Sequence, residues 1–475
     1  MTLICAVIAA DTPAAAKEMT AAARASGAEA FEIRLDAFAE IPDDLSFLPT
    51  DRPVIATFRS ETLDEERRQV FAKALDAGAA YVDIESGSVL RNVYPRDRVI
   101  CSYHDFVKTP SSGEILRIFG DLSASGVPKA AFMVRGPADL LEIRKAALVL
   151  QQSGDPFILI GMGAAGEITR IRAADIGSLV SYCAVRPEFA SAPGQITVAE
   201  AAGLGTDPFV TAITGWPLEH TRSPPMHNAA FRAAGIAGRY VKIPCPPEEL
   251  PLLPEVLRCY RIHGANVTIP HKQAVIAYLA DISAEAARAG AVNTICTGPD
   301  GKLTGTNTDI AGILATAAAL HINPSGARVL VAGAGGAARA AVSCLTAAGA
   351  SVSVTNRTMQ KAAALAAEFG VDAVPPQDLR PEYDLIINAT PAGMSGFSAD
   401  LPIPVSLLTP DTAVFDMVYE PEVTPLLAAA QAAGVRAAVC GRTMLIAQAA
   451  ASFSLWTGIP ADSTAMTGAF DGGRR

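Results

Sequence analysis

The sequence predicts an α/β fold in which a (β/α)8 barrel is followed by a smaller α/β domain and a Rossmann nucleotide-binding domain. Its 475 residues exceed what one hydrophobic core usually organises, so two or three domains are expected. Eight short apolar runs alternate with mostly helix-like connections in the first part, which is the pattern of a parallel barrel. Further on, a glycine-rich turn joins an apolar strand to a helix within residues 329–345, as in dinucleotide-binding domains.

The eight runs of the first part are rich in β-forming residues. They span residues 3–8, 31–36, 53–59, 81–85, 99–105, 129–135, 157–162 and 181–185. Charged side chains stand at or near the C-terminal ends of several runs, namely Arg34, Asp36, Arg59, Glu85, His104 and Asp105. Because the C-terminal ends of the strands form the active face of such a barrel, an active site is expected there.

Two boundaries divide the chain. A helix-like segment over 198–204 and a turn over 205–208 close the first part, so the first domain is expected over 1–205. Strand-like runs resume at 209–215, 238–244, 264–270 and 291–298, which places a second domain over 206–310. The Rossmann pattern follows over 311–440. Small residues dominate after about Pro460, and they predict a mobile tail.

Composition narrows the class of protein. No stretch approaches the roughly 18 uninterrupted apolar residues of a membrane span, and the N-terminus lacks the basic lead-in of a secretion signal, so a soluble protein is expected. A net charge of -10 disfavours binding to nucleic acid and to anionic lipid, so small-molecule partners are expected. The eight cysteines lack C-x-x-C spacing, which predicts no metal and a reducing cytoplasm. Nothing in the sequence indicates the oligomeric state.

Two residues of the first part carry the chemistry of a candidate site. Lysine is scarce, with nine in the chain, and Lys129 opens the apolar run 129–135, where desolvation disfavours the charged ammonium and favours an amine nucleophile. His104 ends the fifth run at the same barrel mouth and can both take and give a proton near neutral pH. Each alone is more often structural, but together they indicate Schiff-base chemistry.

The order and spacing of several motifs point to one family. They are EIRLD (32–36), TFR (57–59), DIE (83–85), SYHDFVKTP (102–110), GVPKAAFMV (126–134), GEITRI (166–171) and SAPGQI (191–196). Over its whole length the first part resembles type I 3-dehydroquinate dehydratase. The resemblance implies that Lys129 forms an imine with the substrate ketone, that His104 removes a proton and returns it to the departing hydroxyl, and that Glu85 assists His104.

The resemblance also implies a set of substrate contacts. Arg170 is expected to bind the substrate carboxylate, since a guanidinium can do so through two parallel hydrogen bonds. Other residues match family positions that bind hydroxyls or order the site: Glu32, Arg34, Arg59, Ser191 and Gln195. The sequence departs from the family after Arg59, where SETLDEE (60–66) replaces a frequent glycine pair, so a different loop shape is expected.

The glycine-rich turn carries the signals of a cofactor site. Gly333, Gly335 and Gly336 let the backbone approach a pyrophosphate, and the helix that follows supplies amide donors. The next strand-like run, 352–358, arrives about twenty residues on. It ends in Asn356, Arg357 and Thr358 and lacks the acidic residue that binds the ribose hydroxyls of NAD, so NADP is expected.

Motifs on both sides of that turn resemble shikimate dehydrogenase. They are GWPLEHTRSPPMHN (215–228), GANVTIPHK (264–272), GAVNT (290–294), GTNTDIAG (305–312), NATPAGM (388–394), DMVYEPEVTPLL (416–427) and GRTMLIAQAAASFSLWTG (441–458). The resemblance implies that helices within 441–475 complete the second domain. It places Lys272 and Asp309 at the reacting carbon, where lysine positions or polarises the oxygen and the pair manages its proton.

The same resemblance assigns the remaining contacts of the second site. Thr221, where serine is common, and Ser223 are expected to bind the substrate carboxylate. The ring hydroxyls are expected to be bound by Thr268, Asn293, Asp309 and Gln448, and Tyr419 is expected near the substrate. The cofactor set adds Ala334, Ala337, Thr390, Met417, Gly441, Met444 and Lys361, the last in place of a frequent arginine.

Two consecutive reactions on one chain are therefore expected: 3-dehydroquinate loses water to give 3-dehydroshikimate, which NADPH then reduces to shikimate, on the route to aromatic amino acids. One alternative is a quinate or quinate/shikimate dehydrogenase in the second half, because one ring hydroxyl separates the substrates. Another is a catalytically dead metabolite-sensing regulator. The joint presence of Lys129, His104, Lys272 and Asp309 argues against the regulator, which needs no nucleophile or proton-transfer groups.

Overall fold

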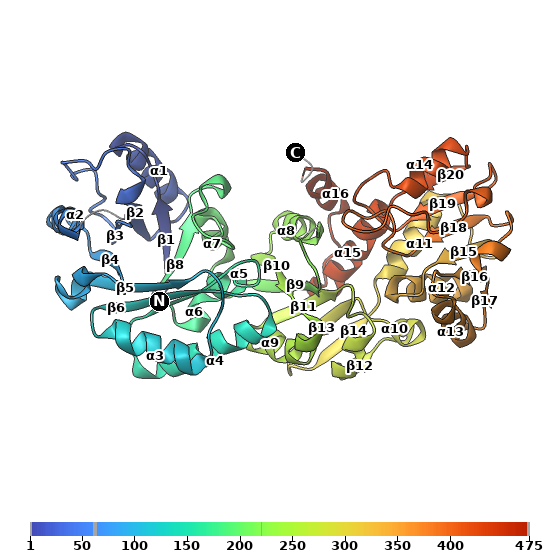
Figure 1. The fold of residues 1–475 in the computed structure, drawn as a ribbon, viewed down its shortest axis with the longest axis horizontal. Coiled ribbons are helices and arrows are strands. Elements are labelled where there is room, and N and C mark those ends of the chain that lie inside the picture. Colours follow the sequence, from blue (N-terminus) through green and yellow to red (C-terminus); the bar gives the residue numbers. More distant parts are fainter. Residues whose placement is uncertain (1, 60–63, 220, 473–475) are drawn as a thin grey trace. The chain divides into compact units, whose positions relative to one another are not determined.

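The computed structural model describes residues 2–59, 64–219 and 221–472 (Figure 1). The chain divides into two compact units. Unit 1 comprises Met1–Ala212 with Ala237–Ile262, and unit 2 comprises Ile213–Ile236 with His263–Arg475. Most of the SETLDEE segment, residues 60–63, lies outside the described residues, so the expected change of loop shape there stays a prediction.

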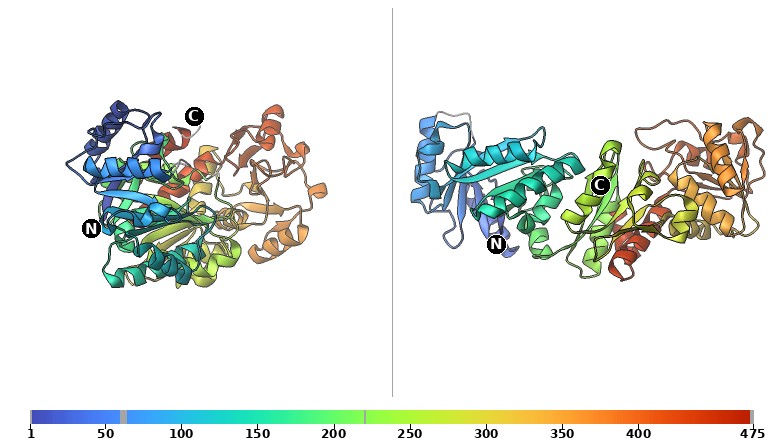
Figure 2. Two further views of the ribbon diagram at one scale, coloured as in Figure 1. Left: turned by 60° about the vertical axis from the view of Figure 1, so that its left-hand side comes forward. Right: turned by 90° about the horizontal axis from the view of Figure 1, so that it is seen from below.

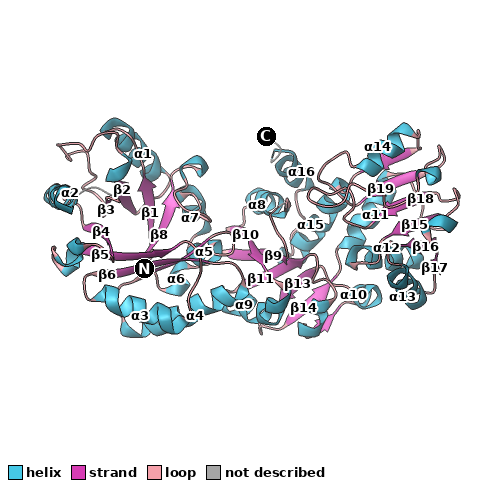
Figure 3. Cartoon of the chain, in the orientation of Figure 1, coloured by secondary structure: helices cyan, strands magenta, loops and turns pink. Residues whose placement is uncertain are grey.

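Eight parallel strands form the sheet of unit 1, drawn in magenta in Figure 3. They are β1 (Leu3–Ile8), β2 (Ala30–Arg34), β3 (Val54–Thr57), β4 (Tyr81–Glu85), β5 (Val99–Asp105), β6 (Val127–Met133), β7 (Ile158–Met162) and β8 (Val180–Ala184). The order β7-β6-β5-β4-β3-β2-β1-β8 makes neighbours of sequential strands and of β1 and β8. The predicted barrel is confirmed.

Helices cover the outside of this sheet. They are α1 (Pro13–Ala25), α2 (Asp64–Asp76), α3 (Ser112–Ser123), α4 (Pro137–Ser153), α5 (Glu167–Ile171), α6 (Ala173–Ile176) and α7 (Val198–Leu204). Local sequence fixes their starts: Thr12 caps α1 ahead of Pro13, and Thr197 and Glu200 form a capping box at α7. Figure 2 shows α3 and α4 side by side along the strands.

The barrel is not closed by a β7–β8 ladder, since no pairing between these strands is present in the sheet order. Side chains fill the seam between them. Thr169 of α5 accepts a hydrogen bond from the amide of Gly161 at 2.8 Å, and Ser178 accepts one from the amide of Leu159 at 3.3 Å. Backbone groups that the missing ladder would have paired are thus satisfied by side chains of the β7–β8 connection.

Unit 1 also contains a segment from beyond the barrel: β10 (Gly238–Pro244), the 3₁₀ turn Pro247–Leu252 and α9 (Leu253–Cys259). Here β10 is the edge strand of a second sheet of order β10-β9-β11-β13-β14-β12. Its other strands are β9 (Phe209–Gly215), β11 (Ile262–Val267), β12 (Asp281–Ile282), β13 (Thr294–Thr297) and β14 (Leu303–Thr306). The sheet is mixed, because β13 runs antiparallel to β11 and β14.

The third sheet is wholly parallel, with order β17-β16-β15-β18-β19-β20. Its strands are β15 (Arg328–Ala332), β16 (Ser351–Thr355), β17 (Asp372–Ala373), β18 (Leu385–Asn388), β19 (Ala413–Asp416) and β20 (Ala437–Val439). The order reverses between β15 and β18, where ligands bind in such folds. The predicted Rossmann domain is confirmed.

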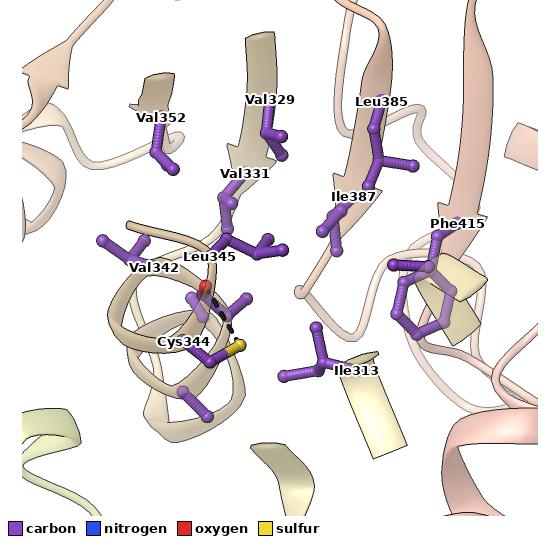
Figure 4. Packing of buried hydrophobic residues seen from close by; sticks show 14 of the residues in the cluster. Ile313, Val329, Val331, Val342, Cys344, Leu345, Val352, Leu385, Ile387 and Phe415 are labelled. Atoms are coloured by element: carbon purple, nitrogen blue, oxygen red, sulfur yellow. Dashed lines mark hydrogen bonds between the residues drawn. The ribbon is translucent and has the colours of Figure 1, made fainter. Parts of the chain in front are cut away.

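Helices cover both faces of the third sheet and enclose two apolar cores. Figure 4 shows the larger core, where Val329, Val331, Leu385 and Ile387 face Leu345. The helices of unit 2 are α8 (Ser223–Ala233), α10 (Ala284–Ala289), α11 (Asp309–Ala319), α12 (Gly336–Ala347), α13 (Met359–Phe369), α14 (Pro425–Ala432), α15 (Arg442–Thr457) and α16 (Ser463–Gly472). Among the described residues, none of the helices has the length and apolarity to span a bilayer.

The expectation of a mobile tail after Pro460 is wrong. Residues Ser463–Gly472 form α16, which packs against α8 and α15. Met466 and Phe470, one helical turn apart, are both fully buried. Two large apolar side chains on one face are enough to dock this helix, and the small residues around them allow close packing.

Candidate active sites

The first site is built around Lys129 inside the barrel. Lys129 lies on β6 between the inward-facing Val127 and Ala131, and the residue is 4% exposed. Its Nζ donates a hydrogen bond to Oδ2 of Asp83 at 2.7 Å and lies 3.8 Å from Oε1 of Glu32. The ammonium also stands 4.1 Å from the ring centroid of Tyr182. The expected burial of Lys129 is present, and two carboxylates lie beside its amine.

Asp83 is the anion at the centre of this site. It is buried on β4 and also accepts hydrogen bonds from Ser102 at 2.6 Å and from Arg59 at 3.2 Å. Burial alone would raise the pKa of Asp83, but the charges of Lys129 and Arg59 outweigh burial and hold that pKa well below its usual range. The site therefore contains a permanent buried carboxylate.

His104 reaches the same cluster through Arg59. The guanidinium Nη1 of Arg59 lies 3.3 Å from His104 Nε2 and 3.1 Å from Glu85 Oε1, while its Nη2 contacts Asp83. Since a guanidinium can only donate, Nε2 is the unprotonated nitrogen of His104. The other nitrogen, Nδ1, stands 3.2 Å from Glu85, although this contact is not aligned as a hydrogen bond.

The electrostatics of His104 suit a base. Burial lowers the pKa of His104, the positive charges of Arg59 and Lys129 lower it further, and the neighbouring Glu85 opposes them. The imidazole is therefore neutral at pH 7 and can accept a proton. For Glu85, burial alone would raise the pKa, but His104 and Arg59 outweigh it and lower that pKa.

The predicted residues Arg34, Ser191 and Gln195 contact polar groups other than Lys129. Arg34 forms a bidentate ion pair with Asp36 at 2.6 and 3.0 Å. Ser191 lies in an exposed loop, where its amide and hydroxyl donate hydrogen bonds to Gln195 at 2.7 and 3.2 Å. Each of these polar groups is thus satisfied by a neighbouring side chain.

Arg170 occupies the seam between β7 and β8, 6% exposed. Its Nη1 donates a hydrogen bond of 3.4 Å to the carbonyl of Tyr182, and its buried Nε has no partner in the described structure. Burial lowers the pKa of Arg170 to about 10. Within the residues that the structure describes, no carboxylate stands at ion-pair distance from it, so this cation lacks an anion.

Sequence reasoning missed Asp83, Ser102 and Tyr182 as parts of the Lys129 site. A signal for Asp83 was available, because alternate residues of a strand share a face: Asp83 and Glu85 both follow the inward-facing Tyr81 at intervals of two. Tyr182 gives no comparable signal, since a tyrosine in a buried strand is ordinarily a core residue.

The second site is a cavity of about 1570 Å³ in unit 2, which exceeds the roughly 300–1,000 Å³ usual for one small ligand. Every predicted residue of the second half lines it. These are Thr221, Ser223, Thr268, Lys272, Asn293, Asp309, Gly333, Ala334, Gly335, Gly336, Ala337, Asn356, Arg357, Thr358, Lys361, Thr390, Met417, Tyr419, Gly441, Met444 and Gln448. The volume suits a dinucleotide together with a small acid.

Lys272 and Asp309 meet in this cavity. Lys272 Nζ donates a hydrogen bond to Oδ2 of Asp309, the first residue of α11. The other oxygen of Asp309 accepts a hydrogen bond of 2.8 Å from the amide of Asn293, which in turn lies 3.4 Å from Gln448 Oε1. Lys272, Asp309 and Asn293 therefore form one hydrogen-bonded group.

A buried hydroxyl network that sequence reasoning missed holds this group. The side-chain oxygen of Asn293 accepts hydrogen bonds from the amide of Thr308 at 2.7 Å and from the hydroxyl of Thr294 at 2.9 Å. Ser452 of α15 joins both threonines at 2.9 and 3.0 Å. With both oxygen and amide engaged, Asn293 has one orientation, which fixes the position of Asp309.

The nucleotide side of the cavity fits a dinucleotide. Gly333 has a φ of +128°, and a Cβ there would stand 2.9 Å from the carbonyl oxygen of Ala389. A Cβ on Gly336, at the start of α12, would meet Lys272 at 2.9 Å, so the helix start adjoins the lysine. Arg357 and Lys361 are exposed at the cavity rim, and neither makes an ion pair in the described part of the chain.

Four family models match successive parts of the chain. A model described as type I 3-dehydroquinase matches residues 4–204, and one described as shikimate dehydrogenase substrate binding domain matches 213–295. A shikimate / quinate 5-dehydrogenase model matches 315–398, and a shikimate 5'-dehydrogenase C-terminal domain model matches 441–469. Among the described residues, no cluster of side chains suits a metal ion.

Solved structures resemble the second half. A shikimate dehydrogenase from Thermus thermophilus, in complex with NADP(H) and shikimate, is 39% identical with a TM-score of 0.51; the match covers 55% of this chain and 98% of that one. A quinate dehydrogenase from Corynebacterium glutamicum, in complex with NAD, is 32% identical with a TM-score of 0.52, covering 56% and 99%.

Curated relatives extend the likeness to the whole chain. The NADP(+) shikimate dehydrogenase of Citrifermentans bemidjiense is 44% identical over 263 residues, which are 52% of this chain and 90% of that relative. The chloroplastic bifunctional 3-dehydroquinate dehydratase/shikimate dehydrogenase of Arabidopsis thaliana is 30% identical over 504 residues, covering 97% and 82%. With a lysine-containing barrel and a dinucleotide cavity on one polypeptide, the chain belongs to the family of bifunctional 3-dehydroquinate dehydratase/shikimate dehydrogenases.

Proposed function

We propose that this chain converts 3-dehydroquinate to 3-dehydroshikimate at Lys129 and reduces that product to shikimate beside Lys272, with NADPH as reductant. The observation that supports both steps is the pairing of each amine with a fixed carboxylate: Lys129 with Asp83 and Lys272 with Asp309. The proposed domains are the dehydratase over 1–205, the substrate-binding domain over 206–310 with helices from 441–475, and the NADP domain over 311–440. The proposed location is the cytoplasm.

The first reaction uses the amine of Lys129 as nucleophile. Its Nζ attacks the substrate ketone, and loss of one water gives an iminium ion, which draws electrons from the neighbouring C–H bond. His104 removes that proton and returns it to the departing hydroxyl, which leaves as a second water. One water then hydrolyses the conjugated iminium and releases the product and the lysine, so the net change is loss of one water.

Buried charge has a defined role in this proposal. The permanent carboxylate of Asp83 stabilises the positive charge of the iminium that forms on Lys129. Arg59 orients His104, and Glu85 stabilises the imidazolium that forms when the proton is taken. Arg170, a buried cation without an anion, is the proposed partner of the substrate carboxylate. Glu32, Arg34, Ser191 and Gln195 are proposed hydroxyl-binding or ordering residues.

The second reaction takes place in the cavity of unit 2. When bound, NADPH supplies the hydride. Lys272 donates a proton to the ketone oxygen. Asp309 is the counter-ion of Lys272 and holds its side chain in position. Thr221 and Ser223 are proposed to bind the carboxylate, and Thr268, Asn293, Tyr419 and Gln448 the ring hydroxyls.

The proposed cofactor contacts follow the cavity wall. The glycine turn and the start of α12 would hold the pyrophosphate, with Ala334, Ala337 and Thr390 beside it. Arg357 and Lys361 are available cations for a 2'-phosphate, with Asn356 and Thr358 between strand and helix. Met417, Gly441 and Met444 would border the nicotinamide.

The purified chain can test both steps in one assay. Given 3-dehydroquinate and NADPH, it is expected to produce shikimate and consume one NADPH per substrate. Lys129→Ala is expected to stop NADPH consumption from dehydroquinate while leaving consumption from dehydroshikimate intact. A Lys129→Ala protein that still turned over dehydroquinate at the full rate would reject the imine mechanism.

Quinate is the second candidate substrate for unit 2, favoured by the likeness to a quinate dehydrogenase. Steady-state rates with shikimate and with quinate, each with NADP and with NAD, separate the two. A higher kcat/KM for quinate than for shikimate would assign the second half to quinate oxidation.

A further inference from the structure

The α5–α6 segment, which carries Arg170, is held from outside the barrel. Unit 1 brings β10, residues 260–261 after α9 and the linker around residues 205–208 against this segment, and α5 and β10 adjoin in Figure 1. Family-model matches place residues 237–262 in the dehydrogenase substrate domain, yet in the fold they pack with the dehydratase. These residues are absent from the lining of the dehydrogenase cavity as far as the structure describes it.

Arg172, between α5 and α6, is the most enclosed contact. Its side chain is 1% exposed, and its guanidinium donates four hydrogen bonds. They reach the carbonyls of Tyr260 (3.2 Å), Pro208 (3.0 Å) and Arg261 (3.0 Å) and the carboxylate of Asp207 (3.0 Å). Each acceptor lies beyond the end of the barrel's last helix, so Arg172 ties the segment to the chain that follows.

Two further ion pairs hold the ends of the segment. Glu167, the first residue of α5, accepts a hydrogen bond of 2.7 Å from Arg239 of β10, which also bonds Glu200 of α7 at 2.6 Å. Asp175 of α6 accepts bidentate hydrogen bonds from Arg261 at 2.7 and 2.8 Å. The segment is therefore fixed at its start, its middle and its end.

The same outer residues also contact α4. The hydroxyl of Tyr260 donates a hydrogen bond of 2.8 Å to the carbonyl of Leu140. The carboxylate of Glu249 accepts one of 2.9 Å from the amide of Ala138, at the start of α4, and a Cβ on Gly136 would meet that carboxylate at 2.6 Å. Residues 237–262 thus cover two consecutive connections of the barrel.

We propose that Arg172 and Arg239 are positioning residues of the dehydratase, which hold α5 so that Arg170 can bind the substrate carboxylate. This rests on the role of Arg170 given under the proposed function. A five-residue helix has few internal hydrogen bonds and does not hold its own position. An unpaired buried guanidinium tends to move toward solvent or an anion, because burying it without a partner is unfavourable. External ion pairs oppose that movement.

The test uses the full chain with Arg239→Gln, since Arg239 is partly exposed and carries both carboxylate contacts. The variant is expected to raise the dehydratase KM for dehydroquinate about tenfold with kcat changed less than about threefold, because binding and not the amine chemistry is disturbed. The KM of the dehydrogenase for dehydroshikimate is expected to stay unchanged. Arg239→Lys, which can pair with one carboxylate, is expected to be intermediate, and it serves if Arg239→Gln does not fold.

A double-mutant cycle separates positioning from general loosening. If Arg239 acts through Arg170, adding Arg239→Gln to Arg170→Met causes no further rise in KM. Arg91→Ala breaks an ion pair of the barrel far from α5 in sequence and is the control expected to leave KM unchanged. An unchanged KM in Arg239→Gln, or effects that simply add to those of Arg170→Met, would overturn the proposal. A normal KM in Arg170→Met alone would instead reject the carboxylate role of Arg170.

Discussion

Lys129 Nζ lies 2.7 Å from Oδ2 of Asp83, and both side chains are buried inside the barrel. The pair forms because β4 and β6 both point side chains into the barrel from either side of β5, which supplies Ser102 as a further donor to Asp83. A buried amine thus has a fixed counter-ion that remains in place when the amine becomes a cationic iminium.

Removing that counter-ion should destabilise the protein. Asp83→Asn leaves Lys129 and Arg59 buried without their shared carboxylate, and loss of one partner of a buried pair costs about 3–5 kcal/mol. Thermal unfolding at pH 7 is expected to show a lower midpoint. Lys129→Met/Asp83→Asn is expected to recover part of the loss, since it removes charge from both sides. Equal midpoints for Asp83→Asn and wild type would contradict a buried ion pair.

On acidification, the loss of dehydratase activity should begin only below the usual pKa of histidine. Because the pKa of His104 is lowered by burial and by neighbouring cations, the imidazole stays neutral below the usual histidine value of about 6.5. The kcat/KM of the dehydratase is therefore expected to fall only below that pH. Folding lowers this pKa, so the unfolded chain binds the proton more readily and His104 reduces stability as pH falls below about 6.5. A midpoint above pH 6.5 for the fall in kcat/KM would contradict a lowered pKa for His104.

Arg170 should contribute to the binding of dehydroquinate and not to the stability of the fold. Arg170→Met removes an unpaired buried cation and replaces it with an apolar side chain, so the unfolding midpoint is expected to stay level or rise. The KM for dehydroquinate is expected to rise at least about tenfold, because a charged hydrogen bond contributes roughly 1.5–3 kcal/mol. Thermal unfolding and steady-state kinetics measure the two effects. A large loss of stability with unchanged KM would make Arg170 a structural residue.

The two activities should respond to separate lysines. Lys272→Met is expected to lower the dehydrogenase kcat by about 100-fold or more, as for loss of a general acid, and to leave the dehydratase unaffected. Lys129→Ala is its matched counterpart and should have the reverse effect. Each variant is assayed with dehydroquinate alone and with dehydroshikimate plus NADPH. Loss of both activities in either variant would show that one substitution disturbs the whole fold.

Cofactor preference should depend on Arg357. Arg357→Ala is expected to weaken the binding of NADPH by about 10–100-fold and the binding of NADH much less, because only NADPH carries the 2'-phosphate. Binding titrations with both nucleotides measure the difference. Arg328→Ala, which removes an exposed arginine paired with Asp384 at the other end of the sheet's central strand, is the control. Equal weakening of both nucleotides would reject the phosphate contact.

The fold could be predicted where apolar runs have sharp polar borders. The runs at 3–8, 81–85, 99–105, 209–215 and 238–244 coincide with β1, β4, β5, β9 and β10. Shorter strands could not be predicted: the two residues of β12, for example, are too few to show the two-residue period of a strand. The docking of α16 was also missed, although Met466 and Phe470 have helical spacing.

The sites were predictable in their reactive residues and less so in what surrounds them. Lys129, His104, Lys272 and Asp309 stand in family motifs, and Lys272 and Asp309 do meet. Partners from distant parts of the chain are invisible in a single sequence: Arg239 is 72 residues from Glu167, and nothing local to either residue signals their contact. The hydroxyl network through Ser452 is of the same kind, with partners 144 and 158 residues apart.

Chemical trapping at the barrel lysine tests the account most directly. Borohydride added during turnover of dehydroquinate reduces an iminium to a stable secondary amine, and mass spectrometry of the digested protein locates it. The expected result is one adduct, on the peptide that contains Lys129, and its absence from Lys129→Ala. Full dehydratase turnover without any adduct, or an adduct on a different lysine, would contradict the account.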